Sequence, residues 1–208
     1  MSDYKNISVG IINLKLNNIF SIISCIKEIG YKVEIIENKK KIKNDLIILP
    51  GVGSFPKAMK FLIKTGLDKS ILEFSKTKKP LIGICLGMQL LFDKSEEFKK
   101  VKGLSLVEGE VKKIPQKKTI VPNIGWQKIN LKKNDKLISN NLEKNFFYFI
   151  HSYYCLPKKK NKILRLTKIN KFEFCSSIRQ DNIYGMQFHP EKSSKSGIKL
   201  FSNFRKIL

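Results

Sequence analysis

Two short segments, far apart in the chain, carry side chains that could perform covalent chemistry together. Residues 83–87 read GICLG and residues 187–191 read QFHPE. A cysteine thiolate is a nucleophile, a histidine can take and return its proton, and a carboxylate can orient that histidine. Cys85 alone is compatible with a buried structural cysteine, and His189 alone with a surface loop. Their occurrence together with Glu191 favours a triad that attacks a carbonyl carbon.

The residues around Cys85 predict a sharp turn between a strand and a helix. A short apolar run at residues 80–84 reads as a buried strand, and a helix is expected over residues 86–92. Gly83 and Gly87 leave room for the close backbone approach that such an elbow needs. Cys85 would then lie at a helix N-terminus, where the backbone favours a thiolate.

A glycine-containing loop follows another apolar strand, expected over residues 45–49. It contains Gly51, Val52 and Gly53, and backbone N–H groups in such a loop could face the oxyanion that develops during acyl transfer. An ordinary Pro-Gly turn explains the same residues equally simply.

The chain resembles a known family along essentially its whole length. It is similar to the class I (triad-type) glutamine amidotransferases, and most closely to the branch formed by the glutaminase subunits of imidazole glycerol phosphate synthase. The resemblance rests on residues 50–55 (PGVGSF), 83–89 (GICLGMQ), 122–126 (PNIGW), 147–154 (FYFIHSYY) and 187–193 (QFHPEKS).

This resemblance implies that the chain hydrolyses L-glutamine through a thioester on Cys85, with His189 as acid and base and Glu191 holding it. It also implies no cofactor. The backbone amides of Val52 and Leu86 would face the oxyanion. By the same resemblance, the positions that hold the amino-acid end of glutamine are Gln89, Ser152 and Tyr153.

The resemblance also implies a partner that uses the ammonia. In the family this is a (β/α)8 cyclase of histidine biosynthesis, which forms a heterodimer with the glutaminase. The positions that match its contact surface are Asn18, Asn123, Trp126 and Tyr148. The two aromatic residues are as compatible with a core as with an interface.

Two segments depart from the family pattern. Residues 13–19 read NLKLNNI, without the two glycines that the family usually has there, and Asn123 stands where a histidine is usual. Both segments lie where the family meets its cyclase. They leave open a related amidotransferase that supplies ammonia to a sugar-amidating synthetase in cell-surface polysaccharide biosynthesis.

The formal charge of +24 raises the question of nucleic acid, because basic surfaces bind phosphates. The excess is almost entirely lysine, and only Arg165, Arg179 and Arg205 carry the guanidinium that suits bidentate phosphate and base contacts. We therefore expect a solvated lysine surface and no nucleic-acid partner.

Composition favours one enzyme domain over residues 1–208. No apolar stretch is long enough to span a bilayer, and the N-terminus lacks a signal-peptide pattern, so we expect a cytoplasmic protein without a membrane partner. The four cysteines show no C-x-x-C pair and are accompanied by only two histidines, which argues against a metal site.

The order of expected elements defines the fold class. Strands and helices alternate as far as the elbow, which predicts an open, mostly parallel, doubly wound α/β sheet with flanking helices. From about residue 104 the pattern changes to short strands, so an antiparallel section is expected to be added. In such sheets ligands bind at the carboxyl edge, where Cys85 would lie.

Two other classes of function remain open at this point. A different Cys-His hydrolase of the same general fold, such as a peptidase, would use the same triad. A basic binding protein without activity would explain the charge but leaves the triad without a role.

Overall fold

The computed structural model describes residues 7–16, 19–139 and 146–208. Its centre is an eight-stranded sheet in the order β2-β1-β3-β4-β14-β13-β12-β9. The strands are β1 Ser8–Ile12, β2 Lys32–Ile36, β3 Leu46–Gly51, β4 Leu81–Cys85, β9 Asn130–Leu131, β12 Ile163–Ile169, β13 Phe172–Gln180 and β14 Ile183–Met186. The first five strands in this order are parallel, and the last three continue the sheet antiparallel.

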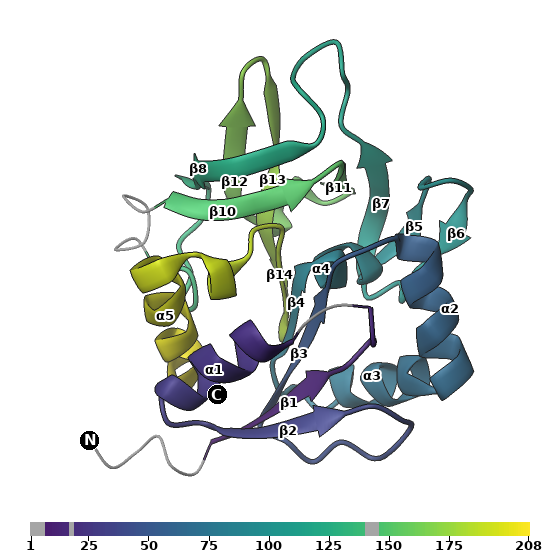
Figure 1. Cartoon of the computed structure of the whole chain (residues 1–208), viewed down its shortest axis with the longest axis vertical. Helices are drawn as coiled ribbons and strands as arrows, with labels where there is room; N and C mark the ends of the chain where they lie inside the picture. The colour runs from purple at the N-terminus through teal and green to yellow at the C-terminus, as the bar shows by residue number, and fades with distance from the viewer. Residues whose placement is uncertain (1–6, 17–18, 140–145) are drawn as a thin grey trace.

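Helices cover both faces of the sheet, which explains why β3 and β4 are buried along their whole lengths. In Figure 1, α1 and α5 lie on one side, and α2 and α3 on the other. The helices are α1 Phe20–Glu28, α2 Phe55–Thr65, α3 Leu67–Ser75, α4 Leu86–Leu90 and α5 Ser194–Ser202, with the short 3-10 helices η2 Lys160–Lys162, η3 Pro190–Lys192 and η4 Asn203–Lys206.

Each pair of helices buries an apolar stripe and so builds one of two cores. Ile22 and Ile26 of α1 are one helical turn apart and pack with α5 against one face of the sheet. The stripe of α2 and α3 packs against the other face. Gly66 joins these two helices in the left-handed conformation, with a φ of 69°, which glycine adopts without a Cβ penalty.

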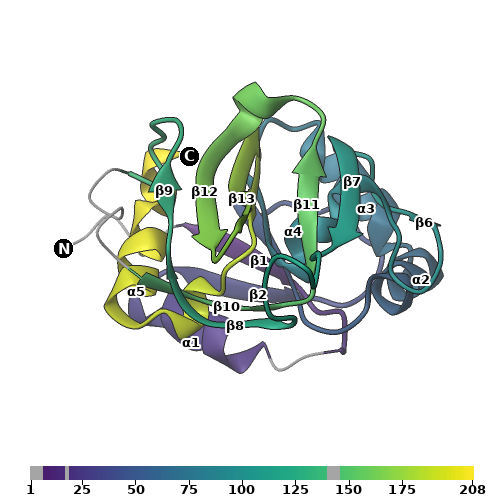
Figure 2. The same ribbon diagram turned by 90° about the horizontal axis from the view of Figure 1, so that it is seen from above.

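The added section consists of two smaller sheets beyond the carboxyl edge of the central one. A four-stranded sheet has the order β11-β7-β5-β6, and a two-stranded antiparallel sheet pairs β10 with β8. Their bounds are β5 Phe92–Ser95, β6 Val101–Lys102, β7 Val107–Lys113, β8 Asn123–Lys128, β10 Phe146–His151 and β11 Tyr153–Pro157. The view from above in Figure 2 shows β8 and β10 running side by side across one end of the molecule.

The fold class predicted from the sequence is confirmed, but some expected bounds are wrong. The helix expected over residues 86–92 ends at Leu90, because the carbonyls of Leu90 and Leu91 accept hydrogen bonds from the backbone of residues 104–107 instead of continuing the helix. Helix α1 begins at Phe20, with Ile19 at the cap position.

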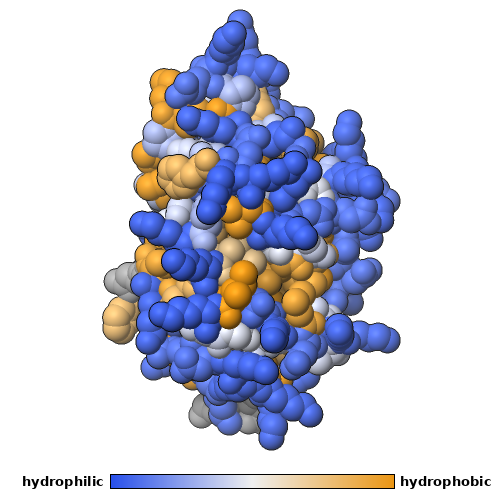
Figure 3. Space-filling view, turned by 90° about the vertical axis from the view of Figure 1, so that its right-hand side faces the viewer, coloured by the Kyte–Doolittle hydropathy of each residue, from blue (hydrophilic) through white to orange (hydrophobic). Residues whose placement is uncertain are grey.

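The face shown in Figure 3, on the side of α2, is covered mostly by hydrophilic side chains. Hydrophobic side chains gather in a smaller area near its middle. In the part of the chain that the structure describes, no helix is long and apolar enough to cross a membrane.

Candidate active site

Cys85 lies on a strained elbow between β4 and α4. Its φ is 53° and its ψ is −110°, which is unusual for a residue with a side chain and is the kind of strain found at functional sites. A Cβ on Gly83 would come within 2.7 Å of the backbone of Gly87, and a Cβ on Gly87 would come within 1.6 Å of the Leu49 oxygen. Both glycines are therefore required by space, as the sequence predicted.

The Pro50-Gly51 pair does not form a turn but continues β3. Gly51 pairs with Cys85 in the register of β3 and β4, so the loop that follows starts beside the sulfur. A Cβ on Gly51 would lie 3.0 Å from the Cβ of Leu86, which shows how closely the two strand ends pack. Gly53 has a φ of 106°, a conformation that favours glycine.

His189 and Glu191 meet as the sequence predicted. Nδ1 of His189 lies 2.7 Å from Oε1 of Glu191, and both side chains are almost fully buried. β10 holds the backbone of this loop, since the N–H of His189 donates to the carbonyl of Tyr148 at 2.8 Å. Ser193 completes the contact: its Oγ accepts from the N–H of Tyr148 and donates to the carbonyl of His189.

The imidazole of His189 interacts electrostatically with Cys85. Burial opposes its protonation, but the charge of Cys85, a contact with its sulfur and the carboxylate of Glu191 together raise the pKa of His189 to about 10. Within the described residues, Nε2 of His189 has no hydrogen-bond partner in this resting geometry. With a pKa of about 10 the ring is an imidazolium at neutral pH, so Nε2 carries a proton that it can give to a leaving group once substrate is bound.

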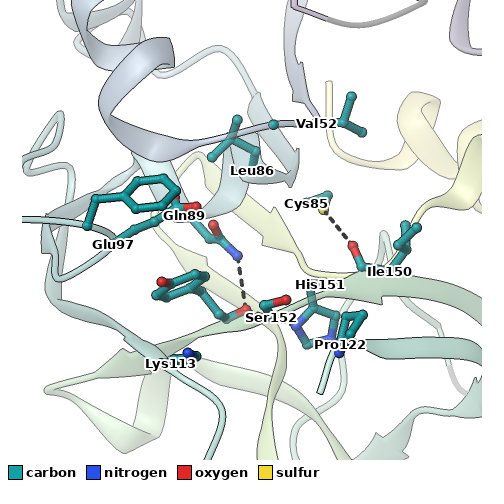
Figure 4. A pocket seen from close by; sticks show the side chains of 13 residues that line it. Val52, Cys85, Leu86, Gln89, Glu97, Lys113, Pro122, Ile150, His151 and Ser152 are labelled. Atoms are coloured by element: carbon teal, nitrogen blue, oxygen red, sulfur yellow. Dashed lines mark hydrogen bonds between the residues drawn. The ribbon is translucent and has the colours of Figure 1, made fainter. Parts of the chain in front are cut away.

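A cavity of about 480 Å³ opens beside the elbow, a size typical of small-molecule sites. Figure 4 shows several of the side chains around it, with Cys85 beside Ile150. The predicted residues that line it are Val52, Gly53, Cys85, Leu86, Gln89, Ser152 and Tyr153. Gly51, His189 and Glu191 are not among the lining residues; Gly51 packs against Leu86, and the side chains of the other two are almost fully buried.

The cavity also contains residues that the sequence did not indicate. Glu97, Phe98 and Lys113 line it from the added section, and Pro122 and Ile150 line it from β8 and β10 and the chain beside them. No spacing rule connects these positions to Cys85, because the fold of the added section brings them there. The carboxylate of Glu97 accepts a hydrogen bond from the N–H of Phe55 at 2.7 Å, and burial raises its pKa.

His151 lines the cavity as a neutral ring. Its Nδ1 lies 2.8 Å from the carbonyl of Tyr153, which can only accept, so Nδ1 carries the proton. Nε2 then accepts from Nδ2 of Asn123 at 2.9 Å. Burial lowers the pKa of His151 to about 4, and the charge of His189 adds to this effect.

We predict that neither histidine titrates between about pH 5 and pH 9. The chain has only two histidines. The pKa of His151 is about 4 and that of His189 about 10, so over this range the first ring stays neutral and the second stays protonated. Ring-proton NMR spectra recorded across this range should show constant shifts. In Cys85→Ala the His189 signal should move with a midpoint below 9, because the sulfur that favours the imidazolium is gone. An imidazole that titrates near 6.5 in the unmodified protein contradicts this assignment.

The same titration links pH to stability. The pKa of His189 is higher in the folded protein than its unfolded value of about 6.5. The stabilisation that protonated His189 gives to the folded state is therefore complete below pH 6.5. It is then lost as the pH rises toward about 10, so the unfolding free energy should fall across this window.

The positions expected at the partner surface lie in different environments. Trp126 is 48% exposed and packs edge-on against Tyr148, with 5.9 Å between ring centroids. Asn123 is only 5% exposed, and its amide is used inside the protein by His151. Asn18 lies outside the described residues.

All four cysteines are free, and within residues 7–16, 19–139 and 146–208 no cluster of His, Cys, Asp and Glu could hold a metal ion.

A strained cysteine elbow, a buried His-Glu pair and a neighbouring glycine loop on a doubly wound sheet are the features of a triad amidotransferase. Residues 11–207 match the family glutamine amidotransferase class-I. The chain belongs to this family. Among solved structures, PurLQS from Thermotoga maritima is similar in fold, with a TM-score of 0.77 and 18% identity, and the match covers 96% of this chain and 98% of that one.

Sequence relatives place the chain more narrowly. It is 39% identical to the imidazole glycerol phosphate synthase subunit HisH of Wolinella succinogenes, over 96% of this chain and 99% of the relative. HisH of Caldanaerobacter subterraneus is also 39% identical, over 96% and 98%. HisH of Aquifex aeolicus is 37% identical, over 94% and 95%.

Proposed function

We propose that the chain is the glutaminase subunit of an imidazole glycerol phosphate synthase. It would hydrolyse L-glutamine to glutamate and ammonia, and the ammonia would pass to a cyclase partner in histidine biosynthesis. The observation that carries this proposal is the full-length similarity to HisH proteins, combined with a Cys-His-Glu arrangement beside a cavity of suitable size. The same relatives favour this function over the amidation of sugars.

The reaction proceeds by two acyl transfers. The imidazolium of His189 already holds the proton of the Cys85 thiol, and the thiolate sulfur attacks the side-chain carbonyl carbon of glutamine. A C–S bond forms, the C–N bond breaks, and His189 gives the proton to the leaving ammonia. His189, now neutral, takes a proton from a water molecule as the water attacks the thioester; the C–S bond breaks, its electron pair returns to the sulfur and glutamate leaves. The backbone amides of Val52 and Leu86 are proposed to stabilise the oxyanion in both steps.

The cavity lining offers groups of both charges to the amino-acid end of the substrate. Glu97 can receive the α-ammonium group, and Lys113 lies on the same cavity for the α-carboxylate. Gln89, Ser152 and Tyr153 line the same cavity, and we propose that they also hold the amino-acid end of glutamine.

The β8–β10 pair presents an exposed apolar face that suits a docked protein. Side chains alternate along both strands, and the outward positions include Ile124, Trp126, Phe146 and Ile150, all more than a third exposed. Ile150 also lines the cavity, so this face borders the place where ammonia is released. We propose that it binds the cyclase, of (β/α)8 type, in a heterodimer. The cytoplasmic location expected from the sequence remains a prediction.

The decisive experiment mixes the chain with the histidine-pathway cyclase of the same organism and measures glutamate released from glutamine. We expect release to rise when the cyclase and its nucleotide ligand are present. Trp126→Ala should weaken binding of the cyclase by roughly 30-fold or more, because a central aromatic of an interface typically contributes about 2 kcal/mol or more. Binding is measured by titration of one subunit with the other.

Ile63→Ala is the matched control, since Ile63 is an exposed apolar residue on α2, outside the β8–β10 face. It should bind the cyclase normally. If the cyclase works on free ammonia but neither binds the chain nor stimulates glutamate release, the proposed partner is wrong.

A further inference from the structure

The side-chain amide of Gln187 points at the sulfur of Cys85. Gln187 is fully buried, and its Nε2 lies 3.7 Å from Sγ, within the range of hydrogen bonds to sulfur. We propose that Gln187 is a catalytic hydrogen-bond donor that stabilises the negatively charged sulfur of Cys85. The inference rests on the proposed function, because it assigns a role within the same reaction.

The orientation of the amide is fixed by its neighbours. The carbonyl of Tyr153 can only accept, so Gln89 must present Nε2 to it, at 3.1 Å, as the dashed line in Figure 4 shows. The same Nε2 lies 3.2 Å from Oε1 of Gln187. Gln187 therefore uses its oxygen toward Gln89, and only its N–H groups remain for Cys85.

The Tyr153 carbonyl also fixes the hydrogen-bond directions of His151 and Asn123, which extend this network away from Cys85. It accepts from Nδ1 of His151 as well, which makes Nε2 of that ring the acceptor for the amide of Asn123. Every member from Asn123 to Gln187 therefore has one possible hydrogen-bond direction. An amide placed in this way does not rotate to present its oxygen to the sulfur.

A second polar contact of the sulfur favours the protonated thiol instead of the thiolate. The thiol donates to the carbonyl of Ile150 at 3.9 Å, a contact that favours the protonated form. The donor from Gln187 favours the ionised form. The titratable groups that interact with the sulfur are His189, held by Glu191, and Cys155 on β11. Among the groups named here, Gln187 is the one that donates a hydrogen bond to the sulfur without carrying a charge.

The donor acts wherever the sulfur carries negative charge. It does so before Cys85 attacks the glutamine carbonyl carbon, and again when water displaces it from the thioester. In that second step His189 takes a proton from the water, the C–S bond breaks and its electron pair returns to Sγ, which leaves as a thiolate. Gln187 supplies no proton in either step; it lowers the energy of the charged sulfur.

The test is the rate at which iodoacetamide alkylates Cys85 at pH 7, without glutamine or partner, followed by peptide mass mapping. Gln187→Met keeps the volume and removes the donor, and should slow alkylation about tenfold. Gln187→Glu keeps an oxygen for Gln89 but offers the sulfur an acceptor when ionised, and should slow alkylation at least as much. With glutamine and the cyclase present, both variants should lower kcat more than they raise KM.

Gln180→Met is the matched control. Gln180 also donates its side-chain amide to a carbonyl, that of Leu106 at 3.0 Å, but lies at the opposite end of β13 from the sulfur. In Gln180→Met, the rate at which Cys85 is alkylated should stay within twofold of the rate in the unmodified protein. A folded Gln187→Met or Gln187→Glu that alkylates at the normal rate would overturn the inference, as would equal slowing in Gln180→Met. An unmodified protein that shows the expected alkylation pattern but no glutaminase activity with any cyclase would instead contradict the proposed function.

Discussion

Cys85→Ala should abolish the release of glutamate from glutamine, with a loss of about 10⁴-fold or more, because no other group can form the thioester. The assay contains saturating cyclase partner, so that the chemical step and not the activation of the subunit is measured. An electrophilic glutamine analogue should add one covalent mass to the unmodified chain and none to Cys85→Ala.

Cys175→Ala is the control for this variant. Cys175 is a buried free cysteine on β13 whose sulfur donates to the carbonyl of Ser177, and it does not line the cavity. It should keep its activity within about twofold. If Cys85→Ala kept more than a thousandth of the normal rate in a clean preparation, covalent catalysis at this residue would be excluded.

Gly87→Ala should destabilise the protein by about 3 kcal/mol or more. The new Cβ would lie 1.6 Å from the Leu49 oxygen, so β3 and the elbow must separate instead of a flexible side chain moving aside. This is a large part of the stability of an ordinary domain. Denaturant-induced unfolding measures the loss, and the midpoint should move without a large change in slope.

Gly125→Ala separates the effect of space from the effect of backbone conformation. Gly125 has a φ of 136°, but nothing lies within 4 Å of a Cβ added there. The cost should therefore be limited to backbone strain, about 1 kcal/mol. If the two variants lost the same free energy, close packing at the elbow would not be the reason for Gly87.

The parts of the site that could be predicted from the sequence are those that depend on local structure. Cys85 between two glycines and His189 two residues before Glu191 have meaning within a few residues of chain. Gln187 belongs to the QFHPEKS segment, but its contact with Cys85 joins the residue after β14 to the end of β4 and has no signature in spacing. Glu97 reaches the cavity only because the chain after α4 folds back as β5.

The strand bounds were least predictable where glycine and proline occur inside strands. Pro50 and Gly51 have the composition of a turn, yet both pair with β4. Pro122 and Gly125 similarly have the composition of a turn, yet β8 starts at Asn123, directly after Pro122, and runs through Gly125. In both places tertiary pairing outweighs local preference.

The two histidines have a consequence for the behaviour of the protein in a living cell. With one ring held neutral and the other held charged, the acidity of the surroundings should not switch the site on or off over the range that cells experience. The rate of ammonia supply should then follow the availability of glutamine and of the docked partner. Nitrogen flow would be set by metabolic demand and would withstand fluctuations in internal acidity.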